Sequence, residues 1–119
     1  MEKTQEVIEG NKLIAEFHGK YNTKWHTIGA FPENQLKYHS SWDWLMPVVE
    51  KIESLDVWVI IKNRICVLDG VFMKADGNNK EYYSDSQRKE SKIEACWLEV
   101  VKFIEVYNSY NSNPQTNKR

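Results

Sequence analysis

The sequence predicts an α+β fold of two layers, in which about three helices pack on a short antiparallel β-meander of two to four strands. Residues 41–55 and 91–108 carry apolar side chains at three- and four-residue steps, which is typical of amphipathic helices. Between them lie two short β-branched runs, residues 57–61 and 64–68, joined by Lys62-Asn63. Asn tolerates positive φ, so this junction favours a tight hairpin between antiparallel strands. The expected element order is α-α-β-β-(β)-α.

The first helix is expected over residues 4–18, where one stripe at helical spacing holds Val7, Gly10, Leu13, Ile14 and Phe17. Thr4 is a suitable N-cap, and Gly19 follows where a C′ glycine belongs. Gly10 weakens a helix by about 1 kcal/mol relative to Ala. We expect that Gly10 is present in spite of this cost because it lets another element approach the helix closely.

Residues 20–36 are broken by Gly, Asn and Pro and carry no long element. A short edge strand is expected over residues 24–28. Connections of this length are unusual inside a compact domain, and such loops often carry function.

The second helix is expected over residues 41–55. Ser40-x-x-Asp43 resembles a capping box with Asp in place of Glu. Pro47 is comfortable only in a first helical turn, because it lacks the N–H that a helix interior uses. Two alternatives follow: the regular helix starts near Trp44, or a helix from Ser41 bends at Pro47.

The β-branched run over residues 57–61 indicates a strand buried on both faces. Asp69-Gly70 is a second turn signal or a bulge, so residues 71–73 form a third strand or continue the second. Residues 76–79 predict an exposed turn, and Tyr82-Tyr83 one more short edge strand.

The last helix is the clearest element, since Ser91-x-x-Glu94 is a capping box. A sustained stripe follows it, made of Ile93, Trp97, Val100, Val101, Ile104 and Tyr107. The helix should end near residues 108–110. We expect a single domain over residues 1–110 and a disordered polar tail over residues 111–119.

Composition excludes several classes of protein. The 16 basic and 17 acidic residues give a formal charge of −1, which argues against binding to duplex DNA through many phosphates. No apolar run is long enough to span a bilayer, and the polar, charged N-terminus is unlike a signal peptide. Cys66 and Cys96 belong to no Cys-x-x-Cys pair and are expected to be buried free thiols. We therefore expect a cytoplasmic protein with no membrane partner.

The most unusual segment is residues 37–45, with sequence KYHSSWDWL, at a loop-to-helix junction. Helix N-termini favour anions, and aromatic faces can stack on a base. The predicted ligand-binding residues are Lys37, Tyr38, His39, Ser40 and Trp44, with Trp25 of the long loop as a secondary candidate. The alternative is that these aromatic residues are core anchors. Trp42 and Leu45 are expected on the buried stripe, and Trp44 is expected to point away from it.

No catalytic motif is recognisable, and the three histidines match no metal-ligand spacing, so we expect no catalytic residues, no metal site and no cofactor. The remaining catalytic alternative is a small hydrolase acting through His39 with Asp43 or a nearby acid.

Residues 38–53, YHSSWDWLMPVVEKIE, resemble a family of small, uncharacterised proteins encoded in bacterial genomes and bacteriophages. Residues 8–17 and 91–108 are similar to the same family. The resemblance implies a phage origin but no established activity. Small accessory phage proteins without catalytic motifs often inhibit host defence, sometimes by sequestering a nucleotide signal.

Two functions are therefore expected. The first is a non-catalytic counter-defence protein that binds and sequesters a small anionic ligand such as a signalling nucleotide. The alternative is a protein–protein interaction module, in which Trp25, Trp44 or an open sheet edge docks a host protein. A homodimer through an edge or a helix face is a further expectation.

Overall fold

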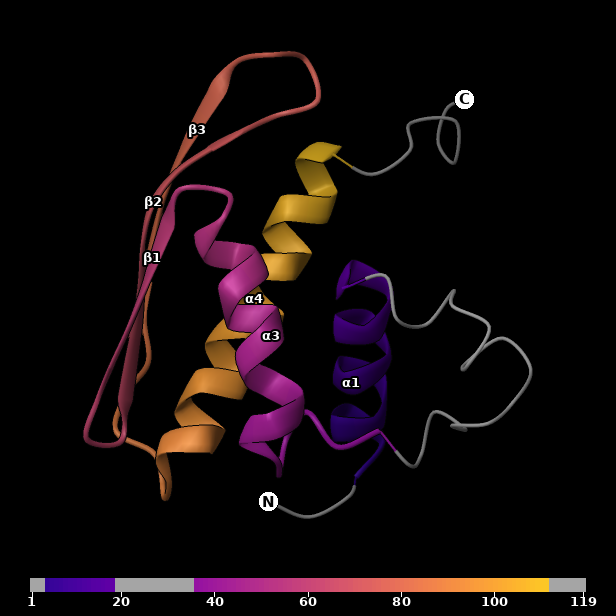
Figure 1. Cartoon of the computed structure of the whole chain (residues 1–119), viewed down its shortest axis with the longest axis vertical. Helices are drawn as coiled ribbons and strands as arrows, with labels where there is room; N and C mark the ends of the chain where they lie inside the picture. Colours follow the sequence, from indigo (N-terminus) through magenta and orange to yellow (C-terminus); the bar gives the residue numbers. More distant parts are fainter. Residues whose placement is uncertain (1–3, 19–35, 112–119) are drawn as a thin grey trace.

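The computed structural model describes residues 4–18 and 36–111, and Figure 1 shows how their elements are arranged. The described elements are, in chain order, α1 (Gln5–His18), α3 (Trp42–Glu53), β1 (Val57–Lys62), β2 (Ile65–Met73), β3 (Asn79–Asp85) and α4 (Lys92–Asn111). Four predictions fall wholly or partly outside the described residues: the strand over residues 24–28, the cap Gly19, the side chain of Trp25, and the tail from residue 112 onwards. Asn111, assigned to the tail, is instead the last residue of α4. None of the described helices is long and apolar enough to cross a membrane.

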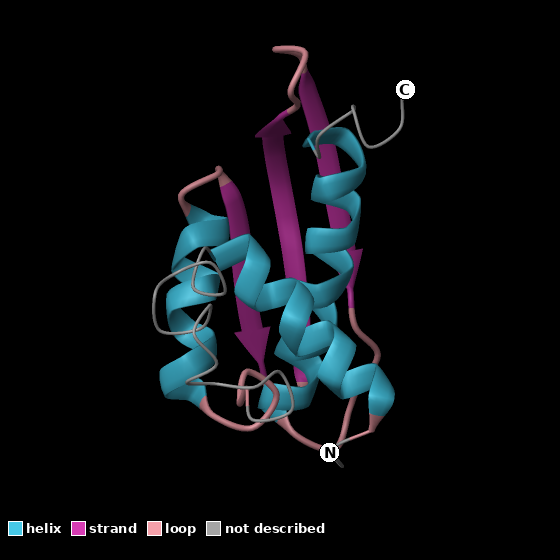
Figure 2. Ribbon diagram, turned by 90° about the vertical axis from the view of Figure 1, so that its right-hand side faces the viewer, coloured by secondary structure: helices cyan, strands magenta, loops and turns pink. Residues whose placement is uncertain are grey.

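The three strands form an antiparallel meander in the order β1-β2-β3, which confirms the predicted α+β fold and its element order. Helices α3 and α4 pack on one face of the sheet, and α1 packs against these two helices from the side away from the strands (Figures 1 and 2). The fully buried side chains that fill this space come from each of the described helices and from the sheet, as Ile14, Leu45, Leu68 and Phe103 illustrate.

The close approach expected at Gly10 is present where α1 crosses α4. A Cβ atom built on Gly10 would lie 2.4 Å from Cζ2 and 2.6 Å from Cη2 of the buried Trp97 ring. The absence of a side chain therefore lets Trp97 pack directly on the α1 backbone. The predicted cap is also confirmed, since the hydroxyl oxygen of Thr4 accepts a 3.3 Å hydrogen bond from the Val7 N–H.

Helix α3 begins at Trp42 and continues through Pro47, so the alternative of a start near Trp44 is wrong. Its N-cap is Ser41, whose side chain makes no capping hydrogen bond, and the predicted capping box at Ser40 is wrong as well. The first turn instead forms from the backbone, because the Ser41 carbonyl accepts from the N–H groups of Trp44 and Leu45.

The hairpin between β1 and β2 is confirmed, with Asn63 at φ 58°. Burial on both faces of β1 was wrong: its residues alternate between the helix-covered face and a face that no described element covers. A β-branched run indicates a strand but not how many layers flank it. Strand β2 runs unbroken for nine residues through Asp69-Gly70, so residues 71–73 continue it, and β3 contains Tyr82 and Tyr83 as expected.

Helix α4 starts as predicted, since the Ser91 hydroxyl oxygen accepts a 3.2 Å hydrogen bond from the Glu94 N–H. The helix carries the largest share of the core, including Phe103, which the stripe had omitted. The ring of Phe103 lies at the centre of an aromatic cluster formed with Phe17, Phe72, Tyr82 and Tyr107. This cluster joins α1, α4 and the sheet.

Candidate functional site

The residues predicted to bind a ligand occupy the turn before α3, and the structure divides them. Tyr38 and His39 are buried, while Lys37 and Ser40 are exposed. The Lys37 carbonyl closes the turn by accepting from the N–H groups of Ser40 and Ser41. Trp44 is half-buried against the core, and Trp42 is exposed, so the expected roles of these two tryptophans are reversed.

A buried polar network explains why His39 faces inward. Trp97 Nε1 donates a 2.8 Å hydrogen bond to Asn11 Oδ1, and Asn11 Nδ2 donates a 3.0 Å hydrogen bond to the Leu36 carbonyl. Because these two contacts fix the amide orientation, Nδ2 also faces His39 Nδ1 at 3.0 Å, and that ring nitrogen accepts. One asparagine thus ties α1 to α4 and to the segment that leads into α3.

This network bears on the hydrolase alternative. A histidine that acts as a general base needs a ring nitrogen within reach of the proton it abstracts. His39 Nδ1 accepts from Asn11, and the residue is 6% exposed. Asp43 is exposed on the first turn of α3. The pairing of His39 with Asp43 as catalytic groups therefore gains no support from this arrangement.

Tyr38 packs edge-on against Trp44, with ring centroids 5.2 Å apart and an interplanar angle of 85°. Burial raises the pKa of the Tyr38 phenol to about 12, because the phenolate would lose its hydration. The ring is a core anchor, and its contact with Trp44 fixes α3 on the preceding turn. The ligand-binding role of this segment stays a prediction, with Lys37 and Ser40 as its exposed members.

The buried phenol makes stability depend on pH in the alkaline range. The contribution of neutral Tyr38 is fully present below pH 10 and is lost as pH rises towards 12, since the unfolded state loses its proton first. A shift of two pKa units corresponds to roughly 2 to 3 kcal/mol. Denaturant melts at pH 9 and 12 should show that wild type loses this much more stability than Tyr38→Phe. Parallel losses in the two proteins would contradict the prediction.

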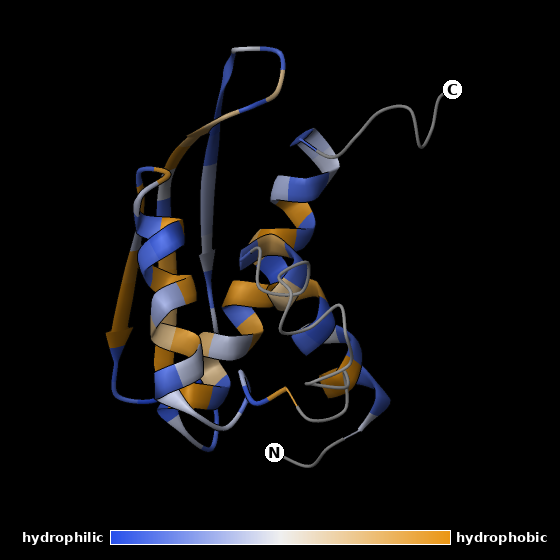
Figure 3. Ribbon diagram, turned by 45° about the vertical axis from the view of Figure 1, so that its right-hand side comes forward, coloured by the Kyte–Doolittle hydropathy of each residue, from blue (hydrophilic) through white to orange (hydrophobic). Residues whose placement is uncertain are grey.

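The second candidate site is the uncovered face of the sheet, here called the outer sheet face. Its large exposed apolar side chains are Trp58, Ile60, Val71, Met73 and Tyr83. Trp58, Met73 and Tyr83 are 72%, 65% and 64% exposed. Figure 3 shows the apolar character of β1 and β2 beside the more polar β3. Large side chains of this kind are normally buried, so their grouping on one face points to a contact surface.

The strand register places one carboxylate among these apolar groups. Asp69 of β2 lies opposite Trp58 of β1 on one side and opposite Tyr83 of β3 on the other. The alternation along β3 puts Glu81 and Asp85 on the same face as Tyr83, and both are exposed. Lys62, at the end of β1, is the cation that this alternation places on the outer sheet face within the described strands. The charge of the face is therefore negative.

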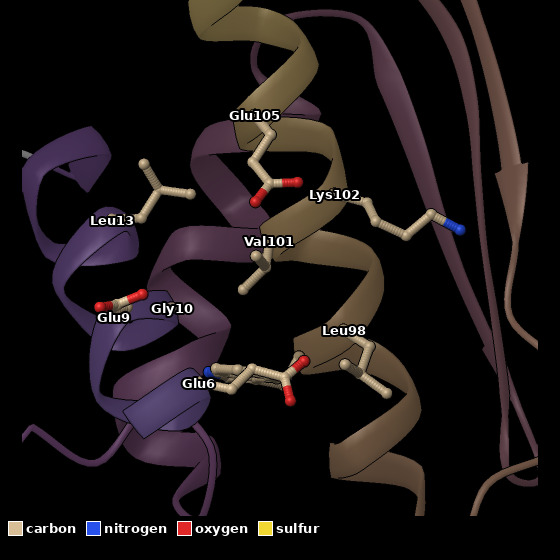
Figure 4. Close-up of a pocket in the computed structure, with 9 residues that line it drawn as sticks. Glu6, Glu9, Gly10, Leu13, Leu98, Val101, Lys102 and Glu105 are labelled. Carbon is tan, nitrogen blue, oxygen red and sulfur yellow. The ribbon is translucent and has the colours of Figure 1, made fainter. Parts of the chain in front are cut away.

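A third candidate is a groove of about 710 Å³ between α1 and α4, shown in Figure 4. Its apolar floor consists of Gly10, Leu13, Trp97, Leu98 and Val101. Its charged residues are Glu6 and Glu9 of α1 and Lys102 and Glu105 of α4. Lys102 points away from α1 towards the sheet (Figure 4), and its ammonium lies 3.3 Å from the buried Glu99 carboxylate. The charges that face the groove are thus mainly carboxylates.

Metal-ligating groups and thiols are the remaining candidates for chemistry among the described residues. Within residues 4–18 and 36–111 no group of three His, Cys, Asp or Glu side chains is placed to hold a metal ion. Cys66 and Cys96 are buried free thiols, as predicted. A hydrogen bond with Cys66, together with burial, raises the pKa of the Cys96 thiol. Such a thiol is a poor nucleophile at neutral pH.

No protein-family model matches this chain, and comparisons with curated proteins and with solved structures return no match. The resemblance of residues 38–53 to bacterial and phage proteins therefore stays a prediction. Sequence reasoning missed the outer sheet face, and β1 carries no signal for it. Trp58 and Ile60 are as apolar as Val57 and Val59, so the run shows no alternation between a covered and an open face.

Proposed function

We propose that this chain is a non-catalytic protein-interaction module that docks a partner protein on the outer sheet face. The observation that carries the proposal is the group of five large apolar side chains exposed together on a face that no described element covers. An interaction module was the alternative to ligand sequestration. The burial of Tyr38 and His39 removes two of the side chains that favoured sequestration, whereas the outer sheet face adds a surface suited to docking.

The apolar side chains of the face are of the kind that form protein contacts. A Trp or Tyr side chain buries roughly 150 to 250 Å² when it is covered. Trp58 and Tyr83 are both mostly exposed, and Met73 adds a flexible apolar side chain that can adapt to a partner. Exposed apolar patches on the order of 300 to 600 Å² on monomers are often functional. Trp and Tyr are also the residues in which binding energy most often concentrates.

Charge selects the kind of partner. Asp69 lies between Trp58 and Tyr83, so a two-fold contact centred on these residues would bring two Asp69 carboxylates together. Like charges in a desolvated contact oppose association. The outer sheet face therefore suits a different protein better than a second copy. The complementary surface is an apolar patch with Lys or Arg placed to meet Asp69, Glu81 and Asp85.

The wider biological role of the module is proposed from the sequence resemblance. The resemblance to phage proteins directs the search for this partner to bacterial proteins, and counter-defence is the role that such an origin favours. Pairing of a second copy along an open edge of β1 or β3 is a separate prediction, since both strands end the three-stranded sheet.

Trp58→Ala tests the proposal, with Trp42→Ala as a matched control on α3. Trp58 is 72% exposed and Trp42 36% exposed, so the control removes the same side chain from a position that packs more closely on the protein. The tagged chain captures candidate partners from a bacterial lysate, and each is purified and titrated by calorimetry. We expect Trp58→Ala to weaken binding at least tenfold and Trp42→Ala to leave it within twofold. Melting temperatures serve as the folding check for both variants.

Asp69→Asn tests the charge of the outer sheet face in the same titrations. Asp69→Asn should weaken binding and flatten its dependence on salt, because a cation of the partner loses its carboxylate. Equal affinity of the Trp58→Ala and Trp42→Ala variants would overturn the assignment of the outer sheet face. Tighter binding by Asp69→Asn would overturn the choice of a basic partner.

A further inference from the structure

The groove between α1 and α4 is separate from the outer sheet face. It is formed by helices, and none of its lining residues belongs to a strand. Gly10 and Trp97 bring the two helices close at its floor, where the added Cβ would meet the Trp97 ring. The exposed rim and the apolar floor form a trough whose residues run from Glu6 to Leu13 on α1 and from Trp97 to Glu105 on α4.

The dimensions of the groove suit a helix. Its lining covers about two turns on each of the flanking helices, or roughly 10 Å along their axes at 1.5 Å per residue. Leu13, Leu98 and Val101 are half-buried, so each keeps apolar surface to offer an incoming side chain. A helix laid between two others packs its apolar stripe into such a trough at spacings of three and four residues.

The charges of the rim specify the polar face of that helix. Glu6, Glu9 and Glu105 are exposed at the groove, while Lys102 is drawn to Glu99. A second copy offering the same groove would set these carboxylates against their equivalents, which opposes self-association. The tail at residues 112–119 is polar apart from Pro114 and carries no large apolar side chain to fill the floor.

We propose that the α1–α4 groove binds a basic amphipathic helix of a partner protein. Leucine-type side chains of that helix fill the floor over Leu13, Leu98 and Val101. Its Lys or Arg side chains meet Glu6, Glu9 and Glu105. Because the groove and the outer sheet face share no residue, the chain can hold two partners at once and act as an adaptor between them.

Two synthetic peptides of fourteen or so residues serve as probes with the full chain, one patterned with Leu and Lys at helical spacing and one with Leu and Glu. Fluorescence anisotropy measures their affinities. The groove variant is Glu6→Lys with Glu9→Lys. Its control, Glu16→Lys with Glu50→Lys, makes the same change in net charge at exposed positions outside the groove. This pairing removes general electrostatic attraction from the comparison.

We expect the Leu/Lys peptide to bind and the Leu/Glu peptide not to bind. The groove variant should weaken binding at least tenfold, the control variant less than threefold, and Trp58→Ala not at all. Amide resonances of Gly10 and Val101 should shift on titration with the Leu/Lys peptide. Because Trp58→Ala tests the outer sheet face alone, the failure of one site is distinguishable from the failure of the other.

Several results would overturn the proposal. Equal weakening by the two charge-reversed variants would mean that the peptide responds to net charge only. Loss of peptide binding in Trp58→Ala would place the peptide on the sheet. A dimer that is altered by the groove variant, without peptide binding, would identify a second copy as the occupant. Binding that appears only after removal of residues 112–119 would identify the tail.

Discussion

Replacement of Asn11 by Leu is expected to lower the free energy of unfolding by about 3 to 5 kcal/mol. The side chain is fully buried and meets three partners at once: Trp97 Nε1, His39 Nδ1 and the Leu36 carbonyl. Leucine fills a similar volume but offers no hydrogen bond, so three polar groups lose their partner in the core. A buried group left without a partner costs about 1 to 3 kcal/mol. Urea unfolding followed by tryptophan fluorescence measures the change.

A double-mutant cycle with Trp97→Phe provides the control. Phenylalanine keeps an aromatic ring in the core but removes the N–H that Asn11 accepts from. The second substitution should therefore cost at least about 1 kcal/mol less in the Asn11→Leu background than in wild type. Strictly additive effects would show that the Asn11–Trp97 hydrogen bond contributes nothing specific to stability.

Local patterns predicted most of the fold, because the elements concerned are specified by neighbouring residues. Helix α4 has a capping serine followed by apolar residues at helical spacing, and both features act within one or two turns. The hairpin depends on Asn63 adopting positive φ, which is again a local property. At Gly10, the loss of helix propensity indicated a close neighbour, and that neighbour is Trp97.

The candidate site was harder to predict, because burial is decided by contacts between distant residues. Asn11 and Trp97 are 86 positions apart, and no residue near Asn11 in the sequence indicates that its side chain has a buried partner. The same difficulty affected His39, since an imidazole beside aromatic residues is typical both of ligand sites and of satisfied polar networks. Trp58 was assigned to a buried strand because an apolar run does not reveal whether a second layer covers it.

The adaptor proposed here relies on a sheet that holds its outer side chains in fixed register. Trp58, Asp69 and Tyr83 come from three strands, and only correct pairing brings them into one row. A shift of one residue in β1 would turn Trp58 towards the helices. The pairing of β1 with β2 is therefore also a determinant of the docking surface.

The pairing of β1 with β2 ends at Gly70, which lies opposite Val57. Gly70→Ala is expected to lower the free energy of unfolding by about 3 kcal/mol. A Cβ atom there would lie 2.3 Å from the Asp56 carbonyl oxygen and 2.6 Å from the Val57 Cα. These are backbone atoms and cannot rotate away as a side chain can. Asp56 is held at φ 72°, and its carbonyl accepts a 3.3 Å hydrogen bond from the Val71 N–H. Relief of the clash therefore requires the start of β1 to move away from β2.

Gly77→Ala is the matched control, because Gly77 has φ +89° and no atom within 4 Å of an added Cβ. Its cost is limited to backbone strain of about 1 to 2 kcal/mol. Denaturant melts compare the two variants, and amide exchange of Trp58 and Ile60, whose N–H groups face β2 in this register, reports on β1 pairing. We expect faster exchange in Gly70→Ala alone. Equal stability of the two variants, with unchanged exchange, would mean that β1 does not lie against Gly70, and the row of Trp58, Asp69 and Tyr83 would then lose its structural basis.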